Sequence, residues 1–237
     1  EQSDTRQGSH GGLGAVRFAD EMKHITPLTK NWTFLDPRSG LWLAAHVPGC
    51  IHTDLLRHKL IPDPFWGSNE KGLQWIEERD WTYRCEFQAP DAGHEHLDLF
   101  AEGLDTLATI TLNGRPIART DNMFLGHRFS ISEALSPGKN TLEISFASPL
   151  KYIRAHQKPT DFAEWNDPVG GSSLLRKEQC SFGWDWGPRF ATCGIYRPIR
   201  LEAWSGNRIG SVLITQSHRK GHVELVLTPR LAAKGPG

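Results

Sequence analysis

Residues 96–119 read HLDLFAEGLDTLATITLNGRPIAR, and this stretch decides the fold. Apolar side chains recur at every second position in two parts of it, which is typical of half-buried strands. They are Leu97 and Leu99, then Ala108, Ile110 and Leu112. Asn113-Gly114 follows at once, and Asn-Gly between two strands is the strongest short hairpin signal because both residues tolerate positive φ. The stretch predicts antiparallel strands over residues 96–101, 106–112 and 115–119.

The same period of two recurs outside this stretch. The turn sequence SPGKN over residues 136–140 is followed by Leu142, Ile144 and Phe146, which place three apolar side chains on one sheet face. Helical signal is sparse, with two turns expected over residues 52–59 and one over residues 132–135. Further strands are expected over residues 195–204, 209–215 and 222–228. The sum predicts an all-β protein built on a β-sandwich of the jelly-roll kind.

The composition divides the chain into three parts. Residues 1–22 are polar and Gly-rich, and we expect them to be a mobile lead-in. Residues 23–206 hold the predicted sandwich, and Ser205-Gly206-Asn207 has the composition of a linker. Two strands alone do not make a stable domain. Residues 207–237 are therefore expected to be the start of a second β domain that is cut short.

The charge balance bears on the class of partner. Lys and Arg total 27, as do Asp and Glu, so the formal net charge is zero. Such a chain has no global field to hold nucleic acid or an anionic membrane, and no apolar run approaches the ~20 residues of a membrane span. We expect neither partner. A neutral sugar ligand requires no such field.

The sequence offers little sign of a metal or cofactor site, and none is expected. Cys50, Cys85, Cys180 and Cys193 lack zinc spacing, and two disulfides or four free thiols are both compatible with them. His94-Glu95-His96 is interpreted as a solvated strand face, because no third ligand lies nearby in sequence. The missing initial Met, the Asn31-Trp32-Thr33 sequon and the cysteines favour a secreted, periplasmic or lysosomal setting and leave the cytoplasm open.

Residues 149–188 have little strand periodicity and are interpreted as an ordered excursion that faces a ligand. They contain the densest chemistry of the chain, Trp184-Asp185-Trp186-Gly187-Pro188. Asp185 is suited to accept hydrogen bonds from sugar hydroxyls, and a tryptophan ring is suited to stack on a sugar. The alternative is a structural corner in which Asp185 is satisfied by backbone amides or by Arg189. Most of the nine tryptophans are expected in the core.

The string over residues 176–189 resembles the signature of family 2 glycoside hydrolases of the β-mannosidase type. Further motifs follow in the order of that family over roughly residues 30–204. They are VPGCIHTDLL (47–56), DPF (63–65), NE (69–70), QWI (74–76), DWTY (80–83), EGLDT (102–106), LNG (112–114), DNMF (121–124) and GIYRP (194–198).

The resemblance implies an architecture and an activity. In that family a galactose-binding-domain-like jelly roll is followed by an immunoglobulin-like sandwich and then by a (β/α)₈ barrel. Residues 207–237 would be the first strands of the immunoglobulin-like sandwich. The barrel carries two glutamates that hydrolyse terminal β-mannosides with retention. A barrel of ~250 residues does not fit in this chain, so no catalytic residue is expected here. Glu70, although it stands in an Asn-Glu dipeptide like that of the acid/base residue, is expected to shape a turn or the pocket edge.

The resemblance also implies site residues. Asp185 would bind hydroxyls of the terminal mannose, Trp184 would form an apolar wall, and Arg176 would orient Asp185, line the pocket or form a structural ion pair. Trp75 and Asn122 lie in matching motifs without an assigned contact. The expected partners are a β-mannoside or manno-oligosaccharide and the barrel of the same polypeptide. Two alternatives stay open, namely a free carbohydrate-binding module and the same domain from a β-galactosidase- or β-glucuronidase-like enzyme.

Overall fold

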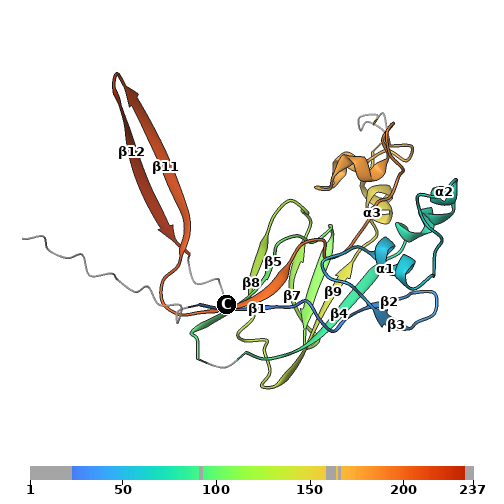
Figure 1. Cartoon of the computed structure of the whole chain (residues 1–237), viewed down its shortest axis with the longest axis horizontal. Coiled ribbons are helices and arrows are strands. Elements are labelled where there is room, and N and C mark those ends of the chain that lie inside the picture. The colour runs from blue at the N-terminus through green and yellow to red at the C-terminus, as the bar shows by residue number, and fades with distance from the viewer. Residues whose placement is uncertain (1–22, 91–92, 159–163, 165–166, 233–237) are drawn as a thin grey trace, which may run out of the picture.

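Two antiparallel sheets make up most of the chain. The structure is a computed structural model that describes residues 23–90, 93–158, 164 and 167–232, so the predicted lead-in lies outside the described residues. One sheet has six strands, in the order β3 (Trp42–Ala44), β2 (Trp32–Leu35), β4 (Trp81–Gln88), β9 (Lys139–Phe146), β6 (Ala108–Leu112) and β7 (Arg115–Thr120). The other has four, in the order β1 (Lys23–Pro27), β10 (Ile199–Trp204), β5 (His96–Ala101) and β8 (His127–Ser130). The predicted all-β sandwich is confirmed (Figure 1).

The core lies between the two sheets, where the period of two places the apolar residues. In β9, Leu142, Ile144 and Phe146 are at most 1% exposed. They stand directly opposite Cys85, Tyr83 and Trp81 of β4, which are equally buried. These cross-strand pairs are a main source of sheet stability, since opposite side chains on one face touch.

The Asn-Gly hairpin forms between β6 and β7 as predicted. Asn113 has φ 53° and Gly114 has φ 79°, the left-handed conformation that such a turn requires. The first of its strands begins at Ala108, two residues later than predicted.

The helices are short and gather at one end of the sandwich (Figure 1). α1 (Ile51–Arg57) is close to the two turns predicted over residues 52–59. The helix predicted over residues 132–135 was wrong, because residues 132–134 form a turn in which Ser132 Oγ accepts a hydrogen bond from the Leu97 amide. The other helices were not predicted. They are α2 (Asn69–Leu73), α3 (Pro149–His156), and the 3₁₀ turns η2 (Gln74–Ile76), η3 (Ser172–Leu174) and η4 (Gln179–Phe182).

The predicted excursion over residues 149–188 has a small apolar core of its own. Leu150 and Ile153 of α3 pack against Leu175, Phe182 and Ala191, all at most 5% exposed. This cluster orders the described part of a segment that has no sheet to join, and it carries the Trp184–Gly187 stretch at the same end of the molecule as α1 and α2.

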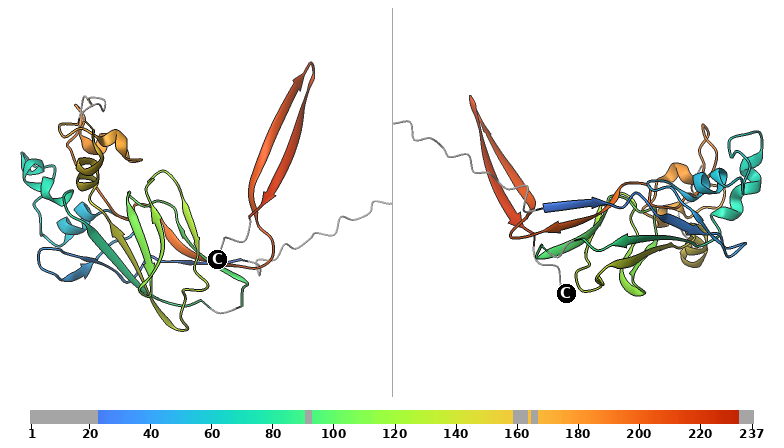
Figure 2. Two further views of the ribbon diagram at one scale, coloured as in Figure 1. Left: turned by 180° about the vertical axis from the view of Figure 1, so that it is seen from behind. Right: turned by 60° about the horizontal axis from the view of Figure 1, so that its bottom comes forward.

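A hairpin of β11 (Ile209–Arg219) and β12 (His222–Leu231) projects away from both sheets (Figure 2). It contains the two strands predicted over residues 209–215 and 222–228, and both are longer than predicted. Arg208 holds its base, because Nη1 lies 3.2 Å from Asp98 Oδ2 and the guanidinium stacks over the Trp204 ring. That this hairpin begins an immunoglobulin-like sandwich remains a prediction.

Candidate functional site

A four-residue turn presents the predicted ligand-binding residues to solvent. Gly183, with φ 115°, turns the chain outward just before it. The Gly187 amide then donates to the Trp184 carbonyl across 3.4 Å and closes the turn. Asp185 and Trp186 occupy the two central positions. A glycine at 183 is required here because a residue with a side chain rarely adopts that backbone conformation.

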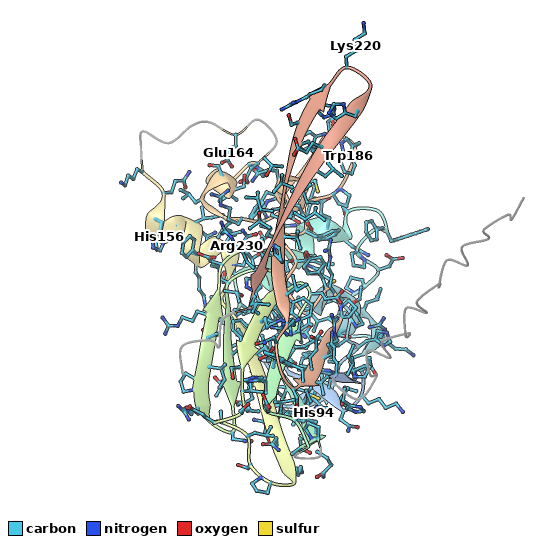
Figure 3. The ribbon with its side chains drawn as sticks, turned by 90° about the vertical axis from the view of Figure 1, so that its left-hand side faces the viewer. His94, His156, Glu164, Trp186, Lys220 and Arg230 are labelled. Atoms are coloured by element: carbon cyan, nitrogen blue, oxygen red, sulfur yellow. The ribbon has the colours of Figure 1, made fainter. Side chains whose placement is uncertain are left out.

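Two tryptophans flank the tip of this turn. Trp184 is 42% exposed and Trp186 is 73% exposed, whereas Trp32 and Trp81 are buried in the sandwich. The two exposed rings lie 6.2 Å apart between centroids, at an angle of 46°. Figure 3 shows Trp186 in the upper part of the view and His94 in the lower part. Exposed indole rings combine an apolar face with one N–H donor, which suits contact with a sugar.

Asp185 is exposed and forms no hydrogen bond or ion pair with another described residue. Arg189 does not satisfy it, because Arg189 pairs with Glu77 instead. No backbone amide of the described residues donates to it either. The turn therefore offers a carboxylate whose acceptor oxygens are available to a ligand.

Arg176 makes its contacts outside this turn. Its side chain is exposed and forms no ion pair with Asp185, and its carbonyl accepts a hydrogen bond from the Met123 amide. The neighbouring residue is the one that pairs, since Lys177 Nζ lies 2.5 and 2.6 Å from the two oxygens of Asp105 in the interior. The contacts of Arg176 therefore do not support the prediction that it orients Asp185, nor the prediction that it forms a structural ion pair.

A pocket of about 480 Å³ opens beside the turn, with Trp184 in its wall. Arg176 and Asp185 are not in the wall, although Asp185 is next to it in sequence. Seven of the thirteen lining residues carry charged or polar side chains. The lining residues are Glu70, Lys71, Gln74, Glu77, Glu78, Leu150, Arg154, Pro168, Val169, Gly183, Trp184, Gly187 and Arg189.

Among these lining residues, Trp184 was predicted as a site residue, whereas Gln74, Glu77 and Arg189 were not. Glu70 was expected to shape a turn or the pocket edge; its Oε1 accepts from the Arg189 amide at 2.6 Å, two residues after the turn, and it lies in the wall of this pocket. Glu77 is only 4% exposed, and burial raises its pKa while Arg189 partly opposes that effect. No local pattern in the sequence indicates a pair whose members are 112 positions apart.

A buried polar cluster lies under the same end of the sandwich. Lys177 and Asp105 form its ion pair, and Thr192 Oγ1 donates to Asp105 Oδ2 at 2.9 Å. His52 is 7% exposed, and its Nδ1 has no hydrogen-bond partner in the part of the chain that the structure describes. Burial lowers the pKa of His52 to about 4, and the charge of Lys177 acts in the same direction.

Trp75 and Asn122, the two motif residues without an assigned contact, both contact other residues of the chain. Trp75 is half-buried, packs on Trp81 and carries the Arg38 guanidinium 4.3 Å above its ring. Asn122 Oδ1 accepts a hydrogen bond from the Phe124 amide. These contacts account for both side chains without a ligand.

No group of three or more His, Cys, Asp or Glu side chains is arranged to hold a metal ion in the described part of the chain. His96 stacks on Trp204 with 4.1 Å between centroids, and the four cysteines are free thiols. Among the helices of the described residues, none combines the length and the apolar character needed to cross a bilayer.

Comparison with known proteins gives a consistent result. The family described as "Glycosyl hydrolase 2 galactose-binding domain-like" matches residues 32–197. The chain is similar to β-mannosidase B of Thermothelomyces thermophilus, with 41% identity over 189 residues, and to β-mannosidase of Capra hircus, with 37% identity over 199 residues. These alignments cover 76% and 79% of this chain.

A solved structure agrees with the sequence comparison. The β-D-mannosidase of Dictyoglomus thermophilum superposes with a TM-score of 0.80 at 36% identity, over 88% of this chain and 26% of that one. The chain spans 22% of the length of each of these two curated relatives. It thus corresponds to one part of much longer proteins.

Proposed function

The chain belongs to the glycosyl hydrolase 2 galactose-binding domain-like family, and on that premise we propose that it is the non-catalytic amino-terminal part of an exo-acting retaining β-mannosidase. Its role there is to complete the substrate pocket formed by a catalytic barrel of the same polypeptide. The substrate is a terminal, non-reducing β-D-mannose residue. The names of the two curated relatives and of the solved structure support this choice of sugar over a β-galactoside or a β-glucuronide.

One observation carries the proposal. Asp185 is an exposed carboxylate without a partner among the described residues, at the tip of a turn between two exposed tryptophans. An isolated carboxylate is a strong acceptor for two hydroxyls, and an ionised acceptor makes stronger hydrogen bonds than a neutral one.

The mechanism assigned to this chain is recognition. Asp185 accepts hydrogen bonds from hydroxyls of the terminal mannose, and Trp184 forms a wall that excludes water on one side. Once substrate and barrel enclose Asp185, a substrate epimer with a misplaced hydroxyl leaves its carboxylate unpaired, and this penalty discriminates between sugars. A wall at the chain end also restricts cleavage to terminal residues. Proton transfer and nucleophilic attack belong to the two glutamates of the barrel.

The test is hydrolysis of 4-nitrophenyl β-mannoside by this chain and by the longer protein that contains it. We expect hydrolysis only by the longer protein. Asp185→Ala is expected to lower kcat/KM by about 100-fold or more, equivalent to ~2.7 kcal/mol of transition-state binding. Glu133→Gln, at an exposed carboxylate that faces Arg115, serves as the matched control and should leave kcat/KM unchanged.

Two results would contradict the proposal. The first is an inactive longer protein, and the second is full activity of a folded Asp185→Ala variant. In either case, titration of the chain with mannose and manno-oligosaccharides tests the free carbohydrate-binding module instead.

A further inference from the structure

The turn that carries Asp185 has little to hold it in place by itself. Its closing hydrogen bond, from the Gly187 amide to the Trp184 carbonyl, is long at 3.4 Å. The side chains of Asp185 and Trp186 are exposed. The position of the carboxylate must therefore be set by the chain that enters and leaves the turn.

The chain that leaves the turn is held by four side chains, which we call the turn anchor: Glu70, Gln74, Glu77 and Arg189. Glu70 Oε1 accepts a hydrogen bond from the Arg189 amide at 2.6 Å. Gln74 Nε2 donates to the Arg189 carbonyl at 3.0 Å. Both main-chain polar groups of Arg189 are thus bound by side chains of α2 and η2.

The side chain of Arg189 adds a buried ion pair to these contacts. Its Nη1 donates to Oε1 of Glu77 and to Oε1 of Gln74. The second oxygen of Glu77 accepts from the Ala191 amide at 3.3 Å. Arg189 is 7% exposed and Glu77 4% exposed, so solvent screens this pair weakly.

The anchor is itself fixed to the sandwich. The carbonyl of Glu77 accepts from Ser148 Oγ at 2.5 Å, at the start of α3. The carbonyl of Ile76 accepts from Nε1 of Trp81, a core residue of β4, at 2.9 Å. Hydrogen bonds at Ile76 and Glu77 therefore connect the six-stranded sheet and the start of α3 to Arg189, two residues after the Trp184–Gly187 turn.

We propose that Glu77 and Arg189 are positioning residues that hold Asp185 where a sugar meets it. The role of Asp185 in this inference rests on the proposed function, whereas the statement that the anchor holds the turn concerns only this chain. A carboxylate displaced by about 1 Å loses much of its effect on a transition state. An anchored turn keeps Asp185 in place without a ligand, so little ordering is required on binding.

The experiment compares Glu77→Gln with Glu202→Gln. Glu202, on β10 of the other sheet, is the matched control because it is a fully buried glutamate that pairs with Arg128 and Arg200. Both substitutions are expected to lower the melting temperature, because each neutralises a buried carboxylate that pairs with arginine.

Two readouts separate positioning from stability. In this chain, hydrogen exchange of the Gly187 and Arg189 amides is expected to quicken about 10-fold or more in Glu77→Gln and to stay unchanged in Glu202→Gln. In the longer protein, Glu77→Gln is expected to lower kcat/KM about 10-fold or more, mainly through kcat, whereas Glu202→Gln leaves it unchanged. If Glu77→Gln does not fold, Glu70→Ala replaces it, because Glu70 is half-buried and its loss removes only the Arg189 amide contact.

Each result has a definite consequence. Equal exchange at Gly187 and Arg189 in both variants overturns the anchor. Faster exchange with unchanged hydrolysis, in a protein that Asp185→Ala inactivates, overturns the positioning role. If Asp185→Ala has no effect on hydrolysis, the proposed function fails, and hydrogen exchange in this chain alone still decides whether the anchor holds the turn.

Discussion

At the residue scale, charge partners decide what each side chain of the Trp184–Arg189 string does. Arg189 is drawn inward by Glu77, and this leaves Asp185 as the exposed carboxylate of the turn. A local reading of the string pairs Asp185 with Arg189 as easily, because the two are only four residues apart. The competing partner lies on a distant helical turn, and its buried position makes the Glu77–Arg189 pair the stronger attraction.

His52 makes folding stability depend on pH. Its pKa falls from 6.5 to about 4 on folding, so the unfolded chain takes up a proton in this window and the folded chain does not. The stability that this group contributes is complete above pH 6.5 and is lost as the pH falls to 4, by about 3 kcal/mol at ~1.4 kcal/mol per pKa unit.

Urea denaturation at pH 7 and at pH 4 tests this effect. In His52→Phe, which keeps a ring against Phe190, the loss of unfolding free energy between the two pH values should be smaller by about 3 kcal/mol. His24→Gln, at an exposed histidine, should behave like the parent chain. An equal loss in all three proteins would show that His52 does not stay neutral in the fold.

At the element scale, the β6–β7 turn does more than reverse the chain. Asn113 Nδ2 donates to the carbonyl of Ala134 at 3.0 Å and to Asn140 Oδ1 at 2.7 Å. Asn113 Oδ1 accepts from the Thr141 amide at 2.9 Å. The side chain therefore ties this turn to the start of β9, which the Asn-Gly signal alone does not predict.

Two substitutions separate these contributions. Asn113→Gly keeps the positive φ and removes the side-chain hydrogen bonds, so it should cost about 1–3 kcal/mol of unfolding free energy. Asn113→Ala adds the strain of a left-handed alanine, about 1–2 kcal/mol more. Urea denaturation should rank the parent above the Gly variant and the Gly variant above the Ala variant. A Gly variant as stable as the parent would mean that the side-chain contacts contribute nothing.

The helix α3, which was not predicted, begins with two local helix-start signals. Ser148 accepts a hydrogen bond from the Lys151 amide as the N-cap, and Pro149 occupies the first turn, both of which are helix-start signals. The eight-residue helix is short, and its buried residues Leu150 and Ile153 form part of the small apolar core. Its presence thus depends on partners near residues 175–191 rather than on propensity alone.

At the scale of the whole molecule, the β11–β12 hairpin has one apolar face that is open to solvent. Directly opposite residues share a face, and Ile214 pairs with Leu227 while Gln216 pairs with Leu225. Leu225 and Leu227 are 57% and 60% exposed. Exposed apolar strands promote association.

Self-association of this chain should therefore depend on that face. The triple variant Ile214→Ser, Leu225→Ser, Leu227→Ser is expected to sediment as a monomer at concentrations where the parent chain associates, with the melting temperature of the sandwich unchanged. The control carries Leu213→Ser and Val226→Ser on the opposite face and should associate as the parent does. Equal behaviour of all three chains in analytical ultracentrifugation would rule out this face as the cause.

The sequence by itself determined the sandwich, the β6–β7 turn and the Trp184–Asp185 pair. Each of these depends on neighbours in sequence: alternation sets the buried face of β9, and Asn113-Gly114 sets the reversal. The tertiary structure alone decided that Glu77 pairs with Arg189, that Arg176 stands apart from Asp185, and that Trp184 lines a pocket. The physical reason is that an ion pair or a pocket forms between side chains brought together by the fold, and no local period encodes a partner more than a hundred residues away.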